Sequence, residues 1–331
     1  GSIINNPNVS ENEENTNSND IIKFSQSSPL LTDLHSLSIK HQNQLISVMK
    51  NLDLSHKKDD HGFVRCGIDE LEAELQQISP EIIAKREQFY QQVAIKKSKI
   101  DFSNTDTIKI PMIFHVLYSN SSENISAAQI GENFDQLNLD FQTTNPDTSK
   151  VPKQVNPLDA PVDPNIDYDH YDVIGSHDVQ FTGYQGETNG SSLEEGTTIR
   201  RYQMSQSTVS GRDEARSLVD SISPDNGAVG GYQEGYFNVY IAPLSGGLLG
   251  QADFDVPQTV IATGTVGSLD SPGTLAPYNL GRTLTHEVGH NFSYYHIFQP
   301  SSCSDDPVMS DIPIQISSNG SGAQLYQMEN N

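Results

Sequence analysis

The sequence predicts an α+β protein in which a mixed, twisted sheet and its helices follow a small helical segment. Residues 108–117 are apolar, β-branched and aromatic, as expected of a sheet strand. Ser126 and Gln129 form a capping box, and apolar residues recur at helical spacing from there to Phe141, so residues 126–141 should form an amphipathic helix. A strand followed by a long helix indicates α/β-like layering in this part of the chain.

Composition divides the chain into three parts. Residues 1–20 are mostly Asn, Glu and Ser, and so few apolar groups cannot offset the entropy of ordering, which predicts a disordered tail. Residues 21–104 carry helical patterns and end at a polar linker, just after the basic run 96–99, where a protease could cut. Residues 105–331 should form the second, larger domain.

Further strands are expected in the larger domain at 179–184, 236–241 and 259–262, separated by Gly, Pro and Ser turns. The long segment 157–172 is dense in Asp and Tyr. Its carboxylates lack the spacing of a calcium loop, so we expect a solvated loop there.

The charge balance excludes some classes of partner. The chain has 19 Lys and Arg against 43 Asp and Glu, a formal net charge of -24, which argues against nucleic acid or an anionic membrane surface. No apolar run approaches the roughly 18 residues of a membrane span. Only Cys66 and Cys303 are present, so the sequence predicts no disulfide framework.

The residue pattern that most clearly indicates a metal site lies at 286–296. His286, Glu287 and His290 form an HExxH motif, and His296 follows six residues later. On a helix, positions i and i+4 share a face, so His286 and His290 can present two imidazole nitrogens to one zinc ion.

His296 would be the third zinc ligand and would leave a fourth position open, which is typical of a catalytic rather than a structural zinc. Glu287 would then act as general base on a zinc-activated water that attacks a peptide carbonyl. The pattern therefore predicts a zinc-dependent peptidase. The non-catalytic alternative is a purely structural zinc site in which Cys66 is the fourth ligand.

The residues around this motif carry a family resemblance. GRTLTHEVGH at 281–290 and YHIF at 295–298 resemble the pappalysin family of metzincin zinc peptidases, and the likeness extends over residues 106–314. It implies a secreted endopeptidase with a sheet-and-helix upper subdomain, an active-site helix at the cleft floor and an irregular lower subdomain. The chain begins without a signal sequence, so we expect that a leader has been removed.

The resemblance also implies a substrate-binding edge. It identifies residues 247–254 with the upper-rim strand, to which an extended protein or peptide substrate would add as an antiparallel strand by backbone hydrogen bonds. The implied residues are Gly247, Leu248, Leu249 and Gly250.

A further implied site lies before the catalytic domain. Arg65-Cys66-Gly67 resembles the cysteine of the family's pro-segment, whose thiolate occupies the open zinc position and keeps the enzyme latent. A disulfide between Cys66 and Cys303, or an inert buried thiol, is the alternative. The acidic stretch 305–313 resembles a calcium loop, with Asp311 as the Ca²⁺ ligand and Ile312 where the family has Thr.

The sequence departs from the family pattern at two places. Ser293 stands where metzincins have Gly at the turn after the helix, and Ser adopts left-handed backbone geometry less easily. No Met-turn is found, and Met328 is near the expected position without the Tyr that accompanies it. A catalytically weak or inactive zinc-binding protein on a degenerate metzincin scaffold is therefore the alternative function.

Overall fold

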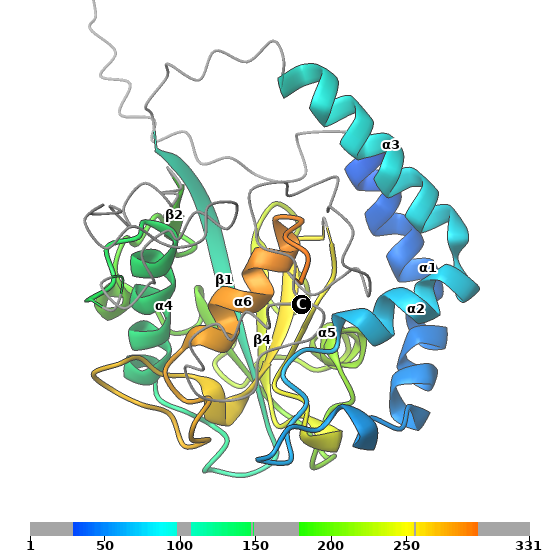
Figure 1. Ribbon diagram of the computed structural model, residues 1–331. Coiled ribbons are helices and arrows are strands. Elements are labelled where there is room, and N and C mark those ends of the chain that lie inside the picture. Colours follow the sequence, from blue (N-terminus) through cyan, green and yellow to red (C-terminus); the bar gives the residue numbers. More distant parts are fainter. Residues whose placement is uncertain (1–28, 98–106, 147, 149–178, 255, 297–331) are drawn as a thin grey trace, which may run out of the picture.

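The computed structural model describes residues 29–97, 107–146, 148, 179–254 and 256–296. Its centre is a six-stranded sheet built around one long strand, β1 (Ile108–Tyr118), which is buried on both faces (Figure 1). The strand order is β2-β1-β4-β6-β5, and β3 pairs with β1 beyond the end of β2. All pairings are parallel except that of β5 with β6, so β5 forms an antiparallel edge.

The remaining strands are short, and those expected from the sequence lie within two residues of their predicted positions. The strands β3 and β5 were not among the strands predicted from residue patterns. The bounds are β2 Val179–Thr182, β3 Ile199–Gln203, β4 Phe237–Ala242, β5 Gly250–Ala252 and β6 Gln258–Ala262.

Two helices cover one face of the sheet. Helix α4 (Ala127–Phe141) begins at Ser126, whose side chain accepts from the Gln129 backbone N–H, which confirms the predicted helix start. It packs beside α6 (Arg282–Asn291) over the main hydrophobic core, in which Phe114 and Phe134 make an edge-on contact. The core fixes α6 against the sheet.

The opposite face of the sheet carries α5 (Arg212–Ser221). Because side chains alternate along a strand, Leu117 and Tyr240 point to this second face, where they pack with Val219 of α5. Three short 3-10 turns complete this part of the chain, at Gly190–Ser192, Ser245–Gly247 and Thr263–Thr265.

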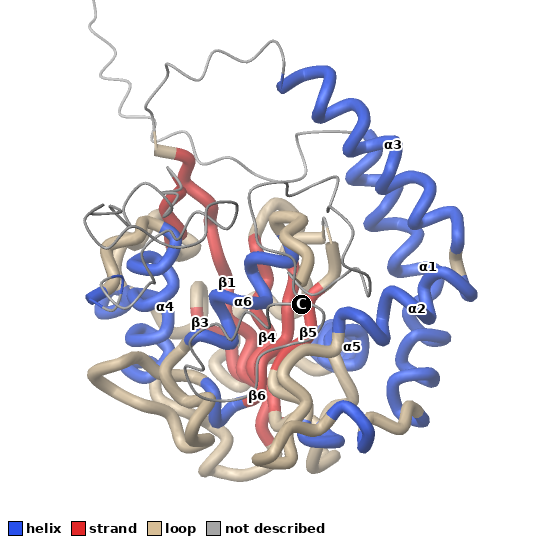
Figure 2. The backbone as a smooth tube through the Cα atoms, viewed as in Figure 1, coloured by secondary structure: helices blue, strands red, loops and turns tan. Residues whose placement is uncertain are grey.

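Three helices precede the sheet and lie along one side of it (Figure 2), where the sequence predicted a small helical segment. They are α1 (Pro29–Asn51), α2 (Ile68–Ile78) and α3 (Pro80–Lys97), with a 3-10 turn at Ser55–Lys57. Leu45, Leu71, Leu75 and Ile82 form their small shared core. We call residues 29–97 the N-terminal helical segment.

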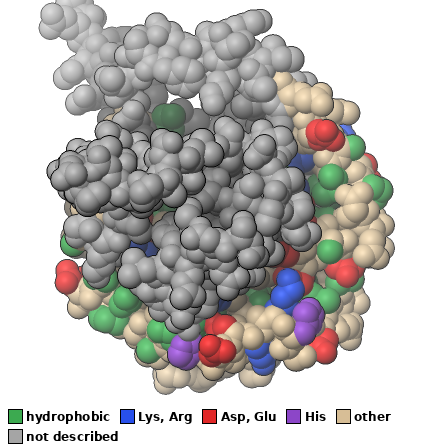
Figure 3. Space-filling view, in the orientation of Figure 1, with side chains coloured by type: hydrophobic (Ala, Val, Ile, Leu, Met, Phe, Trp, Pro, Cys, Tyr) green, Lys and Arg blue, Asp and Glu red, His purple; other side chains and the backbone are tan. Residues whose placement is uncertain are grey.

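Several predicted features fall on residues outside the described ranges. They are the tail at 1–20, the domain boundary near 104, the loop at 157–172 and the acidic stretch at 305–313. Within the described part, no helix combines the length and apolar character that crossing a membrane requires. On the face shown in Figure 3, acidic side chains of the described surface are scattered rather than gathered into one patch.

Candidate metal centre

Helix α6 presents its polar residues to one place because its apolar side is fixed in the core. Leu284 and Val288 are fully buried beneath the helix, which turns His286 and His290 to the opposite side. The helix starts at Gly281 with φ 82°, and a Cβ at this position would lie 2.3 Å from the Gly267 carbonyl oxygen. Glycine is therefore required at the helix start.

The three predicted histidines meet. The Nε2 atom of His286 lies 3.0 Å from that of His290 and 3.2 Å from that of His296. Ligands bound at 2.0–2.1 Å around a tetrahedral ion are about 3.3 Å apart, so these nitrogens converge as ligands of one ion do. The Cys66 thiol completes the cluster, since the ligand atoms of all four residues lie within 4.8 Å of one another.

The outer nitrogens of two rings are held by hydrogen bonds. His290 Nδ1 lies 2.6 Å from the Tyr294 carbonyl oxygen, and His296 Nδ1 lies 3.2 Å from Asp69 Oδ1. An Nδ1–H donor at each ring leaves the Nε2 lone pair facing the common centre. Burial lowers the pKa of His290 to about 4, so its imidazole is neutral at pH 7, as a metal ligand must be. This donor set fits zinc.

The turn after α6 brings His296 back to the cluster. Ser293 has φ 68°, the left-handed conformation for which the sequence comparison with metzincins suggested strain. The Ser293 N–H donates to the His290 carbonyl at 2.8 Å, and the Tyr294 N–H donates to that of Gly289 at 3.1 Å. The turn thus has the geometry that glycine would give, although serine occupies it.

Glu287 is fully buried beside the cluster. Burial raises its pKa to about 8, and the Cys66 thiol donates to its Oε2 at 3.5 Å. The other oxygen, Oε1, has no hydrogen-bond partner within the described part of the chain. It lies so close to β5 that a Cβ on Gly250 would come within 2.5 Å of it.

The predicted substrate-binding edge is already occupied by the chain's own residues 64–67. Val64 N–H donates to the Gly247 carbonyl at 2.9 Å, Leu249 N–H donates to the Val64 carbonyl at 2.9 Å, and Gly67 N–H donates to that of Gly250 at 3.0 Å. The pairing of Val64 with Leu248 is parallel, opposite to the direction predicted for a substrate. Both side chains are buried in one small apolar cluster.

Cys66 is carried to the metal centre by this pairing. Burial and the nearby Glu287 carboxylate raise the pKa of the Cys66 thiol well above its usual value. A metal cation at the centre would reverse that balance and favour the thiolate.

A second contact anchors the same stretch of chain. The Tyr278 hydroxyl donates to the Asp59 carboxylate, which also pairs with the Arg65 Nε at 3.2 Å. The Arg65 guanidinium lies 5.4 Å from the centroid of the Tyr278 ring. Burial opposes ionisation of Asp59, but hydrogen bonds from Tyr278, Arg65 and nearby backbone amides lower its pKa to about 2.

Sequence reasoning missed Asp69, which hydrogen-bonds to His296, and Tyr278, which anchors the stretch that carries Cys66. Asp69 lies three residues after Cys66, in the first turn of α2. Its nearness to Cys66 is the one signal that could have pointed to it. Of the other predicted residues, Cys303 and Asp311 lie outside the described residues, so neither the disulfide alternative nor the calcium prediction is tested.

Comparison with known proteins agrees with this geometry. No protein-family profile matches the chain. The chain is 41% identical over 100 residues to an extracellular metalloprotease of Arthroderma otae, covering 26% of this chain and 34% of that protein. It is 40% identical over 93 residues to extracellular metalloprotease 1 of Coccidioides posadasii, covering 26% and 33%. The matched part thus spans about a third of the length of these curated relatives.

A solved structure has a similar fold. A mutant of promirolysin from Tannerella forsythia matches with a TM-score of 0.51 and 25% sequence identity, over 70% of each chain. The match confirms the predicted fold class, an α+β arrangement of mixed sheet and helices.

Proposed function

We propose that this chain is a pappalysin-like proenzyme of a secreted zinc metalloendopeptidase. His286, His290 and His296 would hold the zinc, Glu287 would be the general base, and Cys66 would keep the site shut. One observation carries the proposal: three imidazole nitrogens and the distant Cys66 thiol converge on one point, and the Glu287 carboxylate lies beside that thiol. The structural match to promirolysin supports it.

The chemistry divides between the ion and the protein. Zinc, when bound, would polarise the scissile carbonyl and acidify a water molecule. Glu287 would accept the proton of that water and pass it to the leaving amine. Without the ion, burial in the shut site raises its pKa to about 8, and a zinc ion beside it would lower this pKa. Entry of water after Cys66 leaves would lower this pKa and give an ionised base.

The substrate would take the place of residues 64–67 on the strand edge. The backbone groups of Gly247, Leu249 and Gly250 that now bond to this stretch would bond to an extended peptide instead. Because residues 64–67 run parallel to the edge, their peptide bonds are presented in the reverse direction. This orientation explains how the chain could cover the site without being a substrate.

Latency would come from a pro-segment at residues 21–104, which includes the N-terminal helical segment, and the catalytic domain would span residues 105–331. Cys66 would supply the fourth zinc ligand as thiolate and exclude water. Cleavage near residues 96–99 would release the segment. Calcium at Asp311 remains a prediction.

The names of the relatives support a location outside the cell and protein or peptide substrates, since they are called extracellular metalloproteases. The left-handed conformation of Ser293 supports an active site over the inactive-scaffold alternative, because the turn keeps its geometry without glycine.

The proposal is tested by measuring zinc and cleavage together. The full chain should contain about one zinc per molecule and, once cut near residues 96–99, should cleave a mixed peptide library in a chelator-sensitive way. Glu287→Ala should abolish cleavage and keep the zinc. Glu234→Ala, at an exposed position, is the matched control and should change neither. Cleavage by Glu287→Ala, or a chain without zinc, would contradict the proposal.

A further inference from the structure

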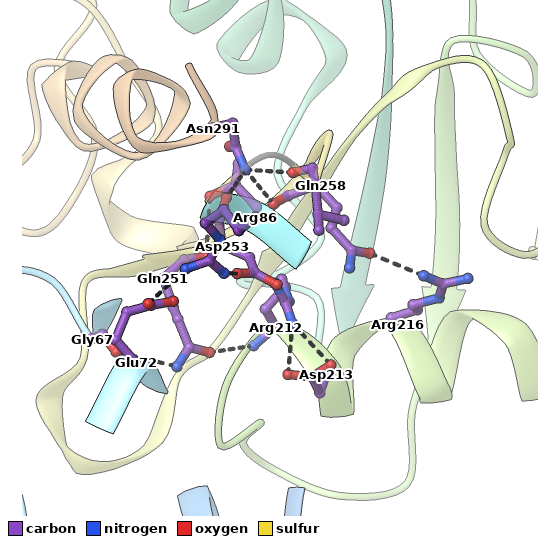
Figure 4. Close-up of polar contacts among 12 residues, drawn as sticks. Gly67, Glu72, Arg86, Arg212, Asp213, Arg216, Gln251, Asp253, Gln258 and Asn291 are labelled. Atoms are coloured by element: carbon purple, nitrogen blue, oxygen red, sulfur yellow. Dashed lines mark hydrogen bonds and ion pairs between the residues drawn. The ribbon is translucent and has the colours of Figure 1, made fainter. Parts of the chain in front are cut away.

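A buried cluster of charges joins the N-terminal helical segment to the far end of β5 (Figure 4). Arg86 of α3 reaches across with Nη2 3.1 Å from Oδ1 of Asp253, the residue that follows β5. Arg212 of α5 lies 2.7 Å from the other oxygen of Asp253 and also hydrogen-bonds to Asp213 at 3.0 Å. These four side chains are almost completely buried.

The Arg86 guanidinium lies in a slot with two chemically distinct walls. One wall is the Asp253 carboxylate, and the other is the Phe254 ring, whose centroid lies 5.2 Å from the guanidinium carbon. The Phe254 ring in turn makes an edge-on contact with His290 at 5.8 Å between centroids. The slot is therefore separated from the metal centre by one aromatic ring.

The two sides of the slot belong to different parts of the chain. Arg86 and its second partner Glu72, 2.6 Å away, both come from the N-terminal helical segment. Asp253 and Phe254 come from the sheet side, where Arg212 is shared between two carboxylates, Asp213 and Asp253. The nearby Arg216 pairs with Asp220 at 3.5 Å. When the segment leaves, Asp253 loses one of its two guanidinium partners, which is costly for a buried carboxylate.

We propose that Asp253 and Phe254 form a substrate subsite for a basic side chain, and that Arg86 occupies this subsite in the latent chain. The inference rests on the proposed peptidase function. A carboxylate beside an aromatic face favours arginine over lysine, because a guanidinium can hydrogen-bond to the one and stack on the other.

The position of the subsite along the substrate follows from strand direction. Gly250 lies beside Glu287, so the scissile bond belongs near this residue. Asp253 and Phe254 come later in the strand direction. A substrate antiparallel to β5 would place residues preceding its scissile bond next to them. The subsite therefore selects a basic residue on the N-terminal side of the cleaved bond.

A binding experiment on the full chain tests this without relying on activity. Arg86→Ala vacates the slot, and N-ethylguanidinium chloride is the probe, with sodium chloride at equal ionic strength as the reference. At ten times the Kd, the ratio of folded to unfolded Arg86→Ala protein should rise about elevenfold, seen as an increase in Tm that grows with the logarithm of the probe concentration. Wild type, with its slot filled, should not respond. Adding Asp253→Asn to Arg86→Ala should remove the response.

No increase in the Tm of Arg86→Ala, or an equal increase in wild type, would overturn the proposal. If Arg86→Ala does not fold, the test uses wild-type chain cut near residues 96–99. Its kcat/KM is measured on peptides that differ at one position before the cleaved bond. Arginine should give about tenfold higher kcat/KM than norleucine there, and equal rates would overturn the subsite. Peptides without basic residues, measured in parallel, show whether the proposed peptidase function itself has failed.

Discussion

The hydrogen bond from His296 to Asp69 predicts that the N-terminal helical segment helps to hold the metal. Asp69→Asn removes the negative charge and keeps the shape of the side chain. The bond joins His296 Nδ1 to Asp69 Oδ1 at 3.2 Å, with 26% of the Asp69 side chain exposed. Burial alone would raise the pKa of Asp69, but this hydrogen bond lowers it, so the carboxylate is ionised at pH 7.

The expected loss follows from this geometry. Hydrogen bonds to charged groups contribute about 1.5–3 kcal/mol, and partial exposure places this one near the lower end, which corresponds to roughly tenfold weaker zinc binding. Zinc Kd is measured on the full chain by competition with a chromophoric chelator. Glu70→Gln is the control, because Glu70 pairs with Lys57 at 3.0 Å. Equal Kd values for Asp69→Asn and wild type would refute the reasoning, as would an equal loss in Glu70→Gln.

Three further changes have defined outcomes. Gly250→Ala should lower the stability of the full chain in thermal unfolding by about 1–3 kcal/mol, because the new Cβ would lie 2.5 Å from Glu287. Gly289→Ala is the control and should cause no such loss, because its new Cβ would lie 3.8 Å from Tyr294. Ser293→Gly should relieve the left-handed strain and raise stability by up to about 1 kcal/mol in denaturant titration, while Ser293→Ala should show no such gain. In zinc-free protein, the free energy of unfolding should fall by up to about 5 kcal/mol as pH rises from 4.5 to about 8. The reason is that Glu287 keeps its proton in the native state, whereas the unfolded carboxyl loses it. Glu287→Gln should remove this fall.

Features that depend on residues close together in the sequence were predictable. The long strand β1 and the helix α4 follow from apolar periodicity and a capping residue, and the histidine cluster follows from fixed spacing on one helix and the turn after it. The short edge strand β5 has only three residues, too few for a pattern, and was located through its resemblance to a family rim strand. Helix α5 was not predicted, since most of its residues are polar or charged.

Contacts between distant parts of the chain were not predictable in the same way. Asp69 and His296 are 227 residues apart, and Arg86 and Asp253 are 167 apart. Each pair depends on how the N-terminal helical segment docks on the sheet, and one sequence contains no periodicity that encodes this docking. Cys66 was placed at the metal centre by resemblance alone, and its thiol lies there in the structure.

The central claim is that Cys66 and three histidines bind one zinc ion in the latent chain. X-ray absorption at the zinc edge of the full-length protein tests it directly, because sulfur and nitrogen ligands lie at about 2.3 and 2.0 Å. We expect three nitrogen ligands and one sulfur ligand in wild type, and three nitrogens with one oxygen in Cys66→Ala. A wild-type spectrum without sulfur, or one unchanged by Cys66→Ala, would contradict the claim.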